Sequence, residues 1–258
     1  MTTLITGASS GIGRELARIA AQNKENLVLV ARSTDKLEQL KTELEKEYGI
    51  TVTCVTRDLA QASAAEELYN ETEQAGLQID TLINSAGFGE FGMFTETNWE
   101  KELAMITVNI TTLTYLCKCY LPKMIAQKSG RILNIASTAA FQPGPTMAVY
   151  YATKAYVLHF SEAINNEVQG TGVTVTALCP GATQSGFQQA SHLEESKLVK
   201  GRKLPTAGEV AAYGYQAMMQ GKSVAVHGLQ NKILATAVRF LPRDTVTAIT
   251  RSVQERAE

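Results

Sequence analysis

The sequence has few cysteines, no excess of either charge and no long apolar run. Its four cysteines include no CxxC pair, and a chain of 258 residues can build a core without disulfides, so we expect reduced thiols and a cytoplasmic protein. With 24 basic and 25 acidic residues, it lacks the positive footprint of a nucleic-acid-binding protein. No uncharged run approaches ~20 residues, and the first residues lead directly into a glycine-rich turn, so we expect no membrane-spanning helix and no leader. No cluster has metal-ligand spacing, so we expect no metal.

Seven short runs rich in β-branched residues alternate with segments of helical period. Each run reads as a buried strand, at residues 3–6, 27–31, 52–56, 81–84, 131–136, 173–179 and 224–226. Strict alternation of strand and helix implies right-handed crossovers and a parallel sheet covered on both faces. The sequence therefore predicts an α/β protein with a single doubly wound, Rossmann-like domain over residues 1–258.

Several helices are predicted to begin at capping boxes, in which two side chains satisfy the first free amides of the helix. This spacing occurs at Ser63 and Glu66, at Thr97 and Glu100, and at Thr206 and Glu209.

The first strand leads into TGASSGIGREL, a glycine-rich turn at the mouth of a predicted helix. A pyrophosphate approaches backbone closely only where side chains are missing, and the helix N-terminus offers free amides to it. We therefore expect dinucleotide binding here. The residues expected to contact the cofactor are Gly7, Ser9, Ser10, Gly11, Ile12 and Gly13.

The end of the second strand indicates which dinucleotide binds. An NAD site usually has a carboxylate at this point, whereas Ala31 and Arg32 stand here. Arg32, with Ser9 and Ser10, is suited to a 2′-phosphate, so we predict NADP(H) over NAD(H). Asp58, after the third strand, is expected to contact the adenine, with capping of the next turn as the alternative.

The stretch VYYATKAYVL places tyrosines around Lys154 on a predicted helix. Tyr150 and Tyr151 both share a face with that lysine, so spacing leaves two candidates for a proton-transferring phenol. At ~4 Å and an effective dielectric of ~20, an ammonium stabilises a phenolate by about 4 kcal/mol. That matches a fall of ~3 units from a tyrosine pKa of ~10, so we expect Lys154 to lower the pKa of its partner.

These motifs together resemble the short-chain dehydrogenase/reductases of the classical type, from residue 3 to about residue 185. TGASSGIG is similar to the cofactor loop of that family, and NSAG at 84–87 to its NNAG turn with a serine substituted. VN at 108–109, ILNIAS ending at residue 137, and YYATK are similar to the family's catalytic segments. CPGATQS is similar to its PG motif, with Ser185 where a threonine is usual.

The resemblance implies a role for each catalytic residue. It selects Tyr150 over Tyr151, because twelve residues then separate it from Ser137. In the reducing direction Tyr150 would protonate the carbonyl oxygen, Ser137 would hydrogen-bond it, and Lys154 would bind the nicotinamide ribose. Asn109 would hold a water that links Lys154 to solvent. The further cofactor contacts implied are Asn84, Ala86, Gly87, Tyr150, Lys154, Pro180, Gly181, Thr183 and Ser185.

Substrate identity must come from loops at the carboxyl ends of the strands. An apolar pocket and a bulky carbonyl compound are one interpretation of their side chains, and a lid packed on the core is the other. The relevant residues are Phe88, Phe91, Met93, Phe94, Phe141, Met147, Phe187, His192 and Leu193, with 182–204 a predicted substrate loop. His192 itself reads as a solvated loop histidine.

The C-terminal extension, residues 228–258, has one apolar face interrupted by Lys232 and Arg239. It could close the active site, join a dimer or lie on a membrane surface. We favour packing or assembly, in a homodimer or homotetramer.

The leading hypothesis is an NADPH-dependent oxidoreductase that reduces a small-molecule carbonyl compound or oxidises the matching alcohol. The alternative from another class is a non-catalytic NADP(H)-binding regulatory or scaffold protein. An epimerase or dehydratase of the extended relatives is less consistent with the glycine-rich turn.

Overall fold

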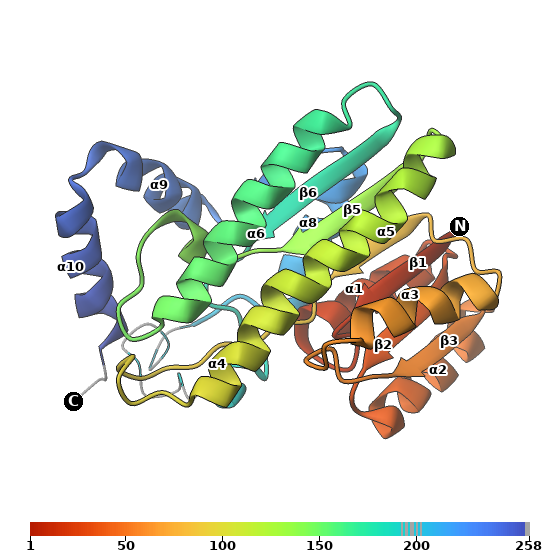
Figure 1. The fold of residues 1–258 in the computed structure, drawn as a ribbon, viewed down its shortest axis with the longest axis horizontal. Coiled ribbons are helices and arrows are strands. Elements are labelled where there is room, and N and C mark those ends of the chain that lie inside the picture. Colours follow the sequence, from red (N-terminus) through yellow and green to blue (C-terminus); the bar gives the residue numbers. More distant parts are fainter. Residues whose placement is uncertain (192, 194–195, 197–198, 200, 202, 256–258) are drawn as a thin grey trace.

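Seven parallel strands form the centre of the molecule in a computed structural model that describes residues 1–191, 193, 196, 199, 201 and 203–255. The strand order is β3-β2-β1-β4-β5-β6-β7 (Figure 1). This confirms the doubly wound parallel sheet predicted from the alternation. The strands are β1 (Thr2–Thr6), β2 (Asn26–Ala31), β3 (Val52–Thr56), β4 (Thr81–Asn84), β5 (Gly130–Ile135), β6 (Val173–Cys179) and β7 (Val224–Val226).

Helices cover both faces of the sheet, because each presents an apolar stripe to a strand surface that is buried on both sides. One core packs α1 (Gly11–Gln22), α2 (Thr34–Tyr48) and α8 (Ala207–Met219) against the sheet. The opposite core is built from α3 (Ala64–Gln74), α5 (Leu113–Ala126) and α6 (Ala148–Glu167). Among the helices of the described chain, every one is too short or too polar to cross a membrane.

A six-residue π-helix, η1 (Thr107–Thr112), joins α4 (Trp99–Ile106) to α5 without a break in the chain direction. Sequence reasoning did not foresee this change of hydrogen-bond pattern. Short π-helical stretches are often found at functional sites, because they redirect a side chain that an α-helix would place elsewhere. Here the residue concerned is Asn109.

Two of the three predicted helix starts agree with the structure, at Ser63 and Thr206, but a capping box forms only at Thr206. The capping box forms at α8, where Thr206 Oγ1 accepts from the Glu209 amide and the Glu209 carboxylate accepts from the Thr206 amide. Helix α4 instead begins one residue later than expected, with Asn98 Oδ1 accepting from the Lys101 amide at 3.0 Å. Ser63 precedes α3 but makes no capping hydrogen bond, since its hydroxyl donates to Glu67.

The remaining helical elements lie at the carboxyl edge of the sheet, on the side toward which the strand arrows point in Figure 1. They comprise η2 (Thr138–Phe141), α7 (Phe187–Ala190), α9 (Leu229–Ala237), η3 (Val238–Phe240) and α10 (Arg243–Gln254). Helices α9 and α10 stand apart from the sheet at that end of the molecule. His192 lies outside the described residues. The same holds for residues 194–195, 197–198, 200, 202 and 256–258.

Candidate active site

The turn between β1 and α1 forms one end of a cavity of about 620 Å³. Gly7 has φ +68°, and a Cβ built on it would lie 2.8 Å from the Ala86 Cα. A Cβ on Gly13 would overlap the Gly7 carbonyl oxygen, so only glycine lets the helix start this close to the strand. The amides at the start of α1 therefore face the cavity with no side chain between, as a phosphate site requires.

Arg32 lies beyond this turn, at the end of β2, and lines the cavity together with Ser9 and Ser10. Its side chain is exposed, and no ion pair ties it to another part of the chain that the structure describes. Asp58 also lines the cavity, and its Oδ1 accepts from the Ala60 amide at 3.1 Å. Asp58 thus makes the turn-capping contact that the sequence left open as an alternative to adenine binding.

Arg57 is a cation at this end that sequence reasoning missed, although it stands next to Asp58. It lines the cavity, but its guanidinium also pairs with the carboxylates of Glu67 and Glu71. Two neighbouring acids offset its charge. Arg32 is therefore the better placed of the two arginines to attract an additional phosphate.

The NSAG turn after β4 brings backbone rather than side chains to the cavity. Thr6 Oγ1 accepts from the amides of Ser85 and Ala86, both at 3.1 Å, which fixes the turn against β1. Ala86 and Gly87 line the cavity, but Asn84 does not. The Asn84 amide donates to Asn134 Oδ1 at 2.9 Å inside the sheet, so the structure does not bring this expected contact residue to the site.

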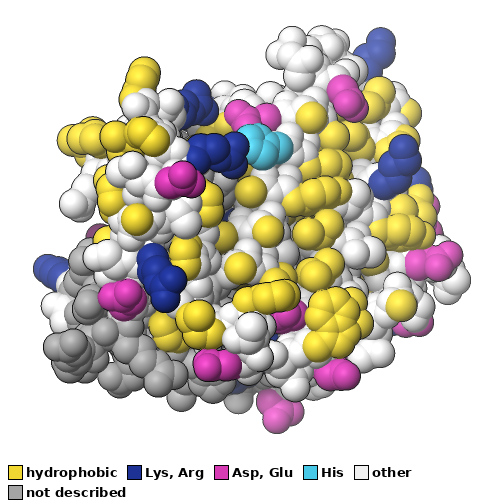
Figure 2. Space-filling view, turned by 60° about the vertical axis from the view of Figure 1, so that its left-hand side comes forward, with side chains coloured by type: hydrophobic (Ala, Val, Ile, Leu, Met, Phe, Trp, Pro, Cys, Tyr) yellow, Lys and Arg dark blue, Asp and Glu magenta, His cyan; other side chains and the backbone are white. Residues whose placement is uncertain are grey.

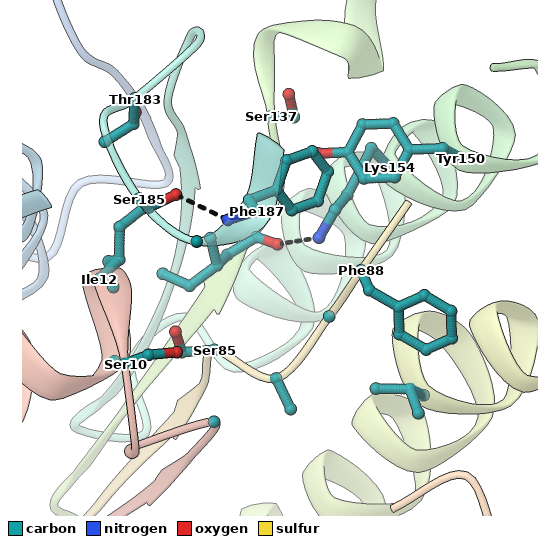
Figure 3. Close-up of a pocket in the computed structure, with 18 of the residues that line it drawn as sticks. Ser10, Ile12, Ser85, Phe88, Ser137, Tyr150, Lys154, Thr183, Ser185 and Phe187 are labelled. Atoms are coloured by element: carbon teal, nitrogen blue, oxygen red, sulfur yellow. Dashed lines mark hydrogen bonds between the residues drawn. The ribbon is translucent and has the colours of Figure 1, made fainter. Parts of the chain in front are cut away.

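The two candidate tyrosines of α6 have different surroundings. Tyr150 points into the cavity, where its ring lies 5.3 Å from that of Phe187 (Figure 3). The Ser137 side chain interacts with its hydroxyl and opposes the effect of burial on its pKa. The Tyr151 hydroxyl is bound by the side-chain amide of Gln254, 103 residues further along the chain. Geometry therefore favours Tyr150 for chemistry next to Ser137.

The expected effect of Lys154 on Tyr150 is not found. Burial raises the pKa of Tyr150 to about 12, and the hydrogen bond to Ser137 only partly opposes this. Lys154 is itself buried, which lowers its pKa to about 8. Its Nζ donates to the Ile135 carbonyl at 2.7 Å and lies 5.8 Å from the centre of the Tyr150 ring (Figure 3). Lys154 is not among the groups that lower the pKa of Tyr150, so the phenol stays protonated at neutral pH.

Ser137 and Asn109 are held by backbone contacts. Ser137 begins η2, where its Oγ accepts from the Ala139 amide at 3.1 Å. Asn109, from η1, bonds both the amide and the carbonyl of Phe88 and donates to Thr153 Oγ1 at 3.0 Å. It lies behind the cavity wall, where a Cβ on Gly87 would meet Asn109 Oδ1 at 3.0 Å and Lys154 Nζ at 3.5 Å. Asn109 and Lys154 thus flank the same glycine.

The segment after β6 crosses over the glycine-rich turn. Pro180, Gly181, Thr183 and Ser185 all line the cavity, and a Cβ on Gly11 would lie 3.5 Å from the Ser185 Cβ. The Thr183 hydroxyl donates to the Gly181 carbonyl at 2.9 Å. Ser185 Oγ accepts from the Phe187 amide at 3.3 Å, which starts the short helix α7 (Figure 3).

The other end of the cavity is apolar. Of the side chains considered for a substrate pocket, Phe88, Met147, Phe187 and Leu193 line it. Phe91 packs against a buried cluster that includes Met147 and Leu193, and Phe141 packs on the main core. Met93 and Phe94 are exposed. Two backbone hydrogen bonds join these loops, from Gly92 to Thr146 at 2.9 Å and from Phe91 to Ser191 at 3.1 Å.

Gln254, the last residue of α10, also lines the apolar end. No sequence pattern marked it, because its contact with Tyr151 exists only in the folded chain. The C-terminal extension thus supplies part of the cavity wall, which agrees with closure of the active site, one of the three roles that its sequence allows.

The cavity fits a nicotinamide dinucleotide on its own geometry. The backbone amides of the glycine-rich turn and Arg32 line one part of it. Ser137, Tyr150 and Lys154 line another part. Its volume falls within the ~300–1,000 Å³ usual for ligand pockets.

Comparison with known proteins agrees with this geometry. Residues 1–196 match the sequence profile of the short chain dehydrogenase family. A 7beta-hydroxysteroid dehydrogenase of Collinsella aerofaciens is 34% identical over 180 residues, which cover 70% of this chain and 68% of that protein.

Two solved structures are similar over most of their length. A short-chain dehydrogenase from Sphingobium yanoikuyae in complex with NADPH has a TM-score of 0.83 and 29% identity, with 98% of each chain covered. A bulky-bulky ketone specific alcohol dehydrogenase from Comamonas testosteroni has a TM-score of 0.79 and 28% identity, with 93% of this chain and 92% of that chain covered.

Proposed function

Because the chain belongs to the short chain dehydrogenase family, we propose that it is an NADPH-dependent carbonyl reductase that also oxidises the matching alcohol. The observation that carries this proposal is a single cavity lined by Arg32, Ser137, Tyr150 and Lys154. A bound reduced nicotinamide supplies the hydride that a carbonyl reduction needs. The residues of this chain hold the substrate and move the proton.

Tyr150 is the proton donor in this proposal. A phenol with a pKa of about 12 is protonated at neutral pH, which suits donation to a developing alkoxide. Ser137, hydrogen-bonded to the same phenol, also donates to the carbonyl oxygen as negative charge grows. The raised pKa therefore keeps Tyr150 in the protonated form that carbonyl reduction requires.

Lys154 and Asn109 replace the proton that Tyr150 gives up. With a pKa near 8, Lys154 is mostly protonated at neutral pH yet can release a proton inside the cavity wall. Asn109 lies against the same glycine, and its bonds to Phe88 hold the loop there. In the proposal it holds a water that connects Lys154 to solvent.

The remaining contacts belong to the cofactor. The glycine-rich turn, from Gly7 to Gly13, binds the pyrophosphate, and Arg32 with Ser9 and Ser10 binds the 2′-phosphate. Ser185 or Thr183 contacts the nicotinamide. Asp58 contacts the adenine through whichever carboxylate oxygen its turn leaves free.

The substrate proposed is a bulky apolar ketone. The apolar wall formed by Phe88, Met147, Phe187 and Leu193 supports this, because such a wall favours ligands with little polar surface. The likeness to an alcohol dehydrogenase named for bulky-bulky ketones supports it independently.

Self-association and a cytoplasmic location complete the proposal. Trp99, Leu103, Tyr115 and Ile125 are exposed on α4 and α5, as a homodimer or homotetramer interface would leave them in a single chain. Figure 2 shows hydrophobic side chains spread broadly over one side of the molecule. The four free cysteines fit a reducing compartment.

A fluorescence titration with NADPH and, in parallel, NADH tests the cofactor assignment. We expect tighter binding of NADPH, and Arg32→Ala should weaken NADPH binding about 10- to 100-fold while changing NADH binding little, since a lost charge-assisted hydrogen bond costs about 1.5–3 kcal/mol. Preference for NADH in the parent protein would show that Arg32 is misassigned. Binding of neither dinucleotide would remove the basis of the enzyme proposal.

A further inference from the structure

Gln254 is a buried polar residue in the apolar end of the cavity. Only 1% of its surface is exposed. Its Nε2 donates to the Tyr151 hydroxyl, and its backbone carbonyl accepts from Ser196 Oγ at 2.9 Å. The side-chain oxygen Oε1, in contrast, has no hydrogen-bond partner among the residues that the structure describes. The position of the side chain is thus fixed while half of its amide is unsatisfied.

An unsatisfied amide oxygen is a cost that a folded protein rarely keeps without a use. The surroundings make the cost larger, because Ala139, Met147, Tyr151 and Leu193 form a buried apolar cluster against which Tyr150 and Phe187 pack. A methionine or leucine would fill the same space without that cost. Isolated polar groups in apolar pockets usually fix the orientation of a ligand.

We propose that Gln254, positioned by Tyr151, is a polar subsite that binds a hydroxyl group of the substrate at the end remote from the reacting carbonyl. The inference rests on the proposed function, since it takes Tyr150 as the group that meets the carbonyl. The rings of Tyr150 and Tyr151 are 6.1 Å apart, so one bulky ketone can reach both. The substrate class becomes a hydroxylated, otherwise apolar ketone.

A hydroxyl group fits this subsite better than other polar groups. The Tyr151 hydroxyl can accept from the amide nitrogen or, after rotation of the amide, donate to the amide oxygen. In either rotamer the amide keeps one group for the ligand, the acceptor oxygen or the donor nitrogen. A hydroxyl can pair with either one, because it both donates and accepts hydrogen bonds. The described side chains of this cluster are uncharged, so they would not compensate a buried carboxylate for its lost hydration.

The test compares two ketones that differ by one remote hydroxyl: 4-(4-hydroxycyclohexyl)cyclohexanone and 4-cyclohexylcyclohexanone. We expect kcat/KM of the parent protein to favour the hydroxylated ketone about tenfold, the effect of one buried hydrogen bond. Gln254→Met, which keeps the volume and removes the amide, should bring the ratio close to one. Tyr151→Phe frees the amide and should give an intermediate ratio, which provides a second variant if Gln254→Met folds poorly.

Gln188→Met is the matched control. Gln188 lines the same cavity, but its amide is paired at both ends, with the Ser185 amide and the Thr183 carbonyl. Its replacement should leave the ratio between the two ketones unchanged. A purely structural role for Gln254 would alter both ketones equally, so an equal ratio in the parent and in Gln254→Met would overturn the subsite.

Calorimetric titration of the same proteins with the two ketones separates this inference from the proposed function. If neither ketone is reduced but the hydroxylated one binds more tightly and loses that advantage in Gln254→Met, the subsite stands and the proposed function fails. If both are reduced and bound at ratios that Gln254→Met does not change, the function stands and the subsite is overturned. If neither ketone is reduced and the hydroxylated ketone binds no more tightly than the other, both the proposed function and the subsite are contradicted.

Discussion

The proposed chemistry depends on two side chains whose pKa values the fold shifts in opposite directions. Burial raises the pKa of Tyr150 to about 12 and lowers that of Lys154 to about 8. The sequence predicted the pair, because helical spacing placed a tyrosine beside Lys154. It did not predict the sign at Tyr150, since spacing does not reveal that Nζ is directed to the Ile135 carbonyl.

Lys154 should cost stability while it is charged. Its folded-state pKa of about 8 lies below the ordinary 10.5, so between these values the unfolded chain binds more protons and stability rises with pH. A shift of this size corresponds to about 3 kcal/mol. Lys154→Met also loses the hydrogen bond to the Ile135 carbonyl, which offsets part of this gain. We therefore expect the variant to be more stable than the parent by about 1–2 kcal/mol at pH 7.

Urea unfolding at pH 7 and at pH 9.5 measures this difference, because other titrating groups are common to both proteins. The advantage of Lys154→Met should shrink at the higher pH, where the lysine of the folded parent is neutral. A variant no more stable at pH 7, or an advantage independent of pH, would show that burial does not penalise this lysine.

At the scale of elements, strands were predictable and helix ends were less so. The seven strands agree with the β-branched runs, because burial on both faces leaves little choice of residue. Helix starts depend on which of several neighbouring polar side chains reaches the first amides. Asn98 takes that position from Thr97, and Ser63 bonds a carboxylate instead.

The placing of Asn109 shows the same limit within the site. The VN pair identified the residue by resemblance, but nothing in its neighbours announces a π-helix. That local winding directs its amide to the backbone of Phe88, 21 residues earlier in the chain. Contacts of this kind depend on tertiary structure and are not written in a local pattern.

The capping difference gives a direct prediction of stability. Thr206→Ala removes the side chain that accepts from the Glu209 amide, and should lower the free energy of unfolding by about 1 kcal/mol. Ser63→Ala is the matched control and should change it by less than about 0.5 kcal/mol, because Ser63 caps nothing. Chemical denaturation of both variants measures the two values. Equal losses would mean that the capping box adds no stability.

At the scale of the whole molecule, the site is assembled from segments far apart in the sequence. The glycine-rich turn near the N-terminus, η2 and α6 in the middle, and α10 near residue 254 all line one cavity. The residues proposed for phosphate binding and proton transfer could be selected from the sequence because each belongs to a compact motif. The substrate end could not, because Gln254 meets Tyr151 only through the fold.

The central claim is that this cavity is a reductase site in which Tyr150 transfers the proton. The most direct measurement is kcat for ketone reduction, with NADPH affinity measured in parallel, in Tyr150→Phe and Tyr151→Phe. We predict that Tyr150→Phe binds NADPH nearly as the parent does and loses about 10²- to 10⁴-fold in kcat, while Tyr151→Phe loses far less. Full activity in Tyr150→Phe, with Tyr151→Phe inactive, would contradict the account.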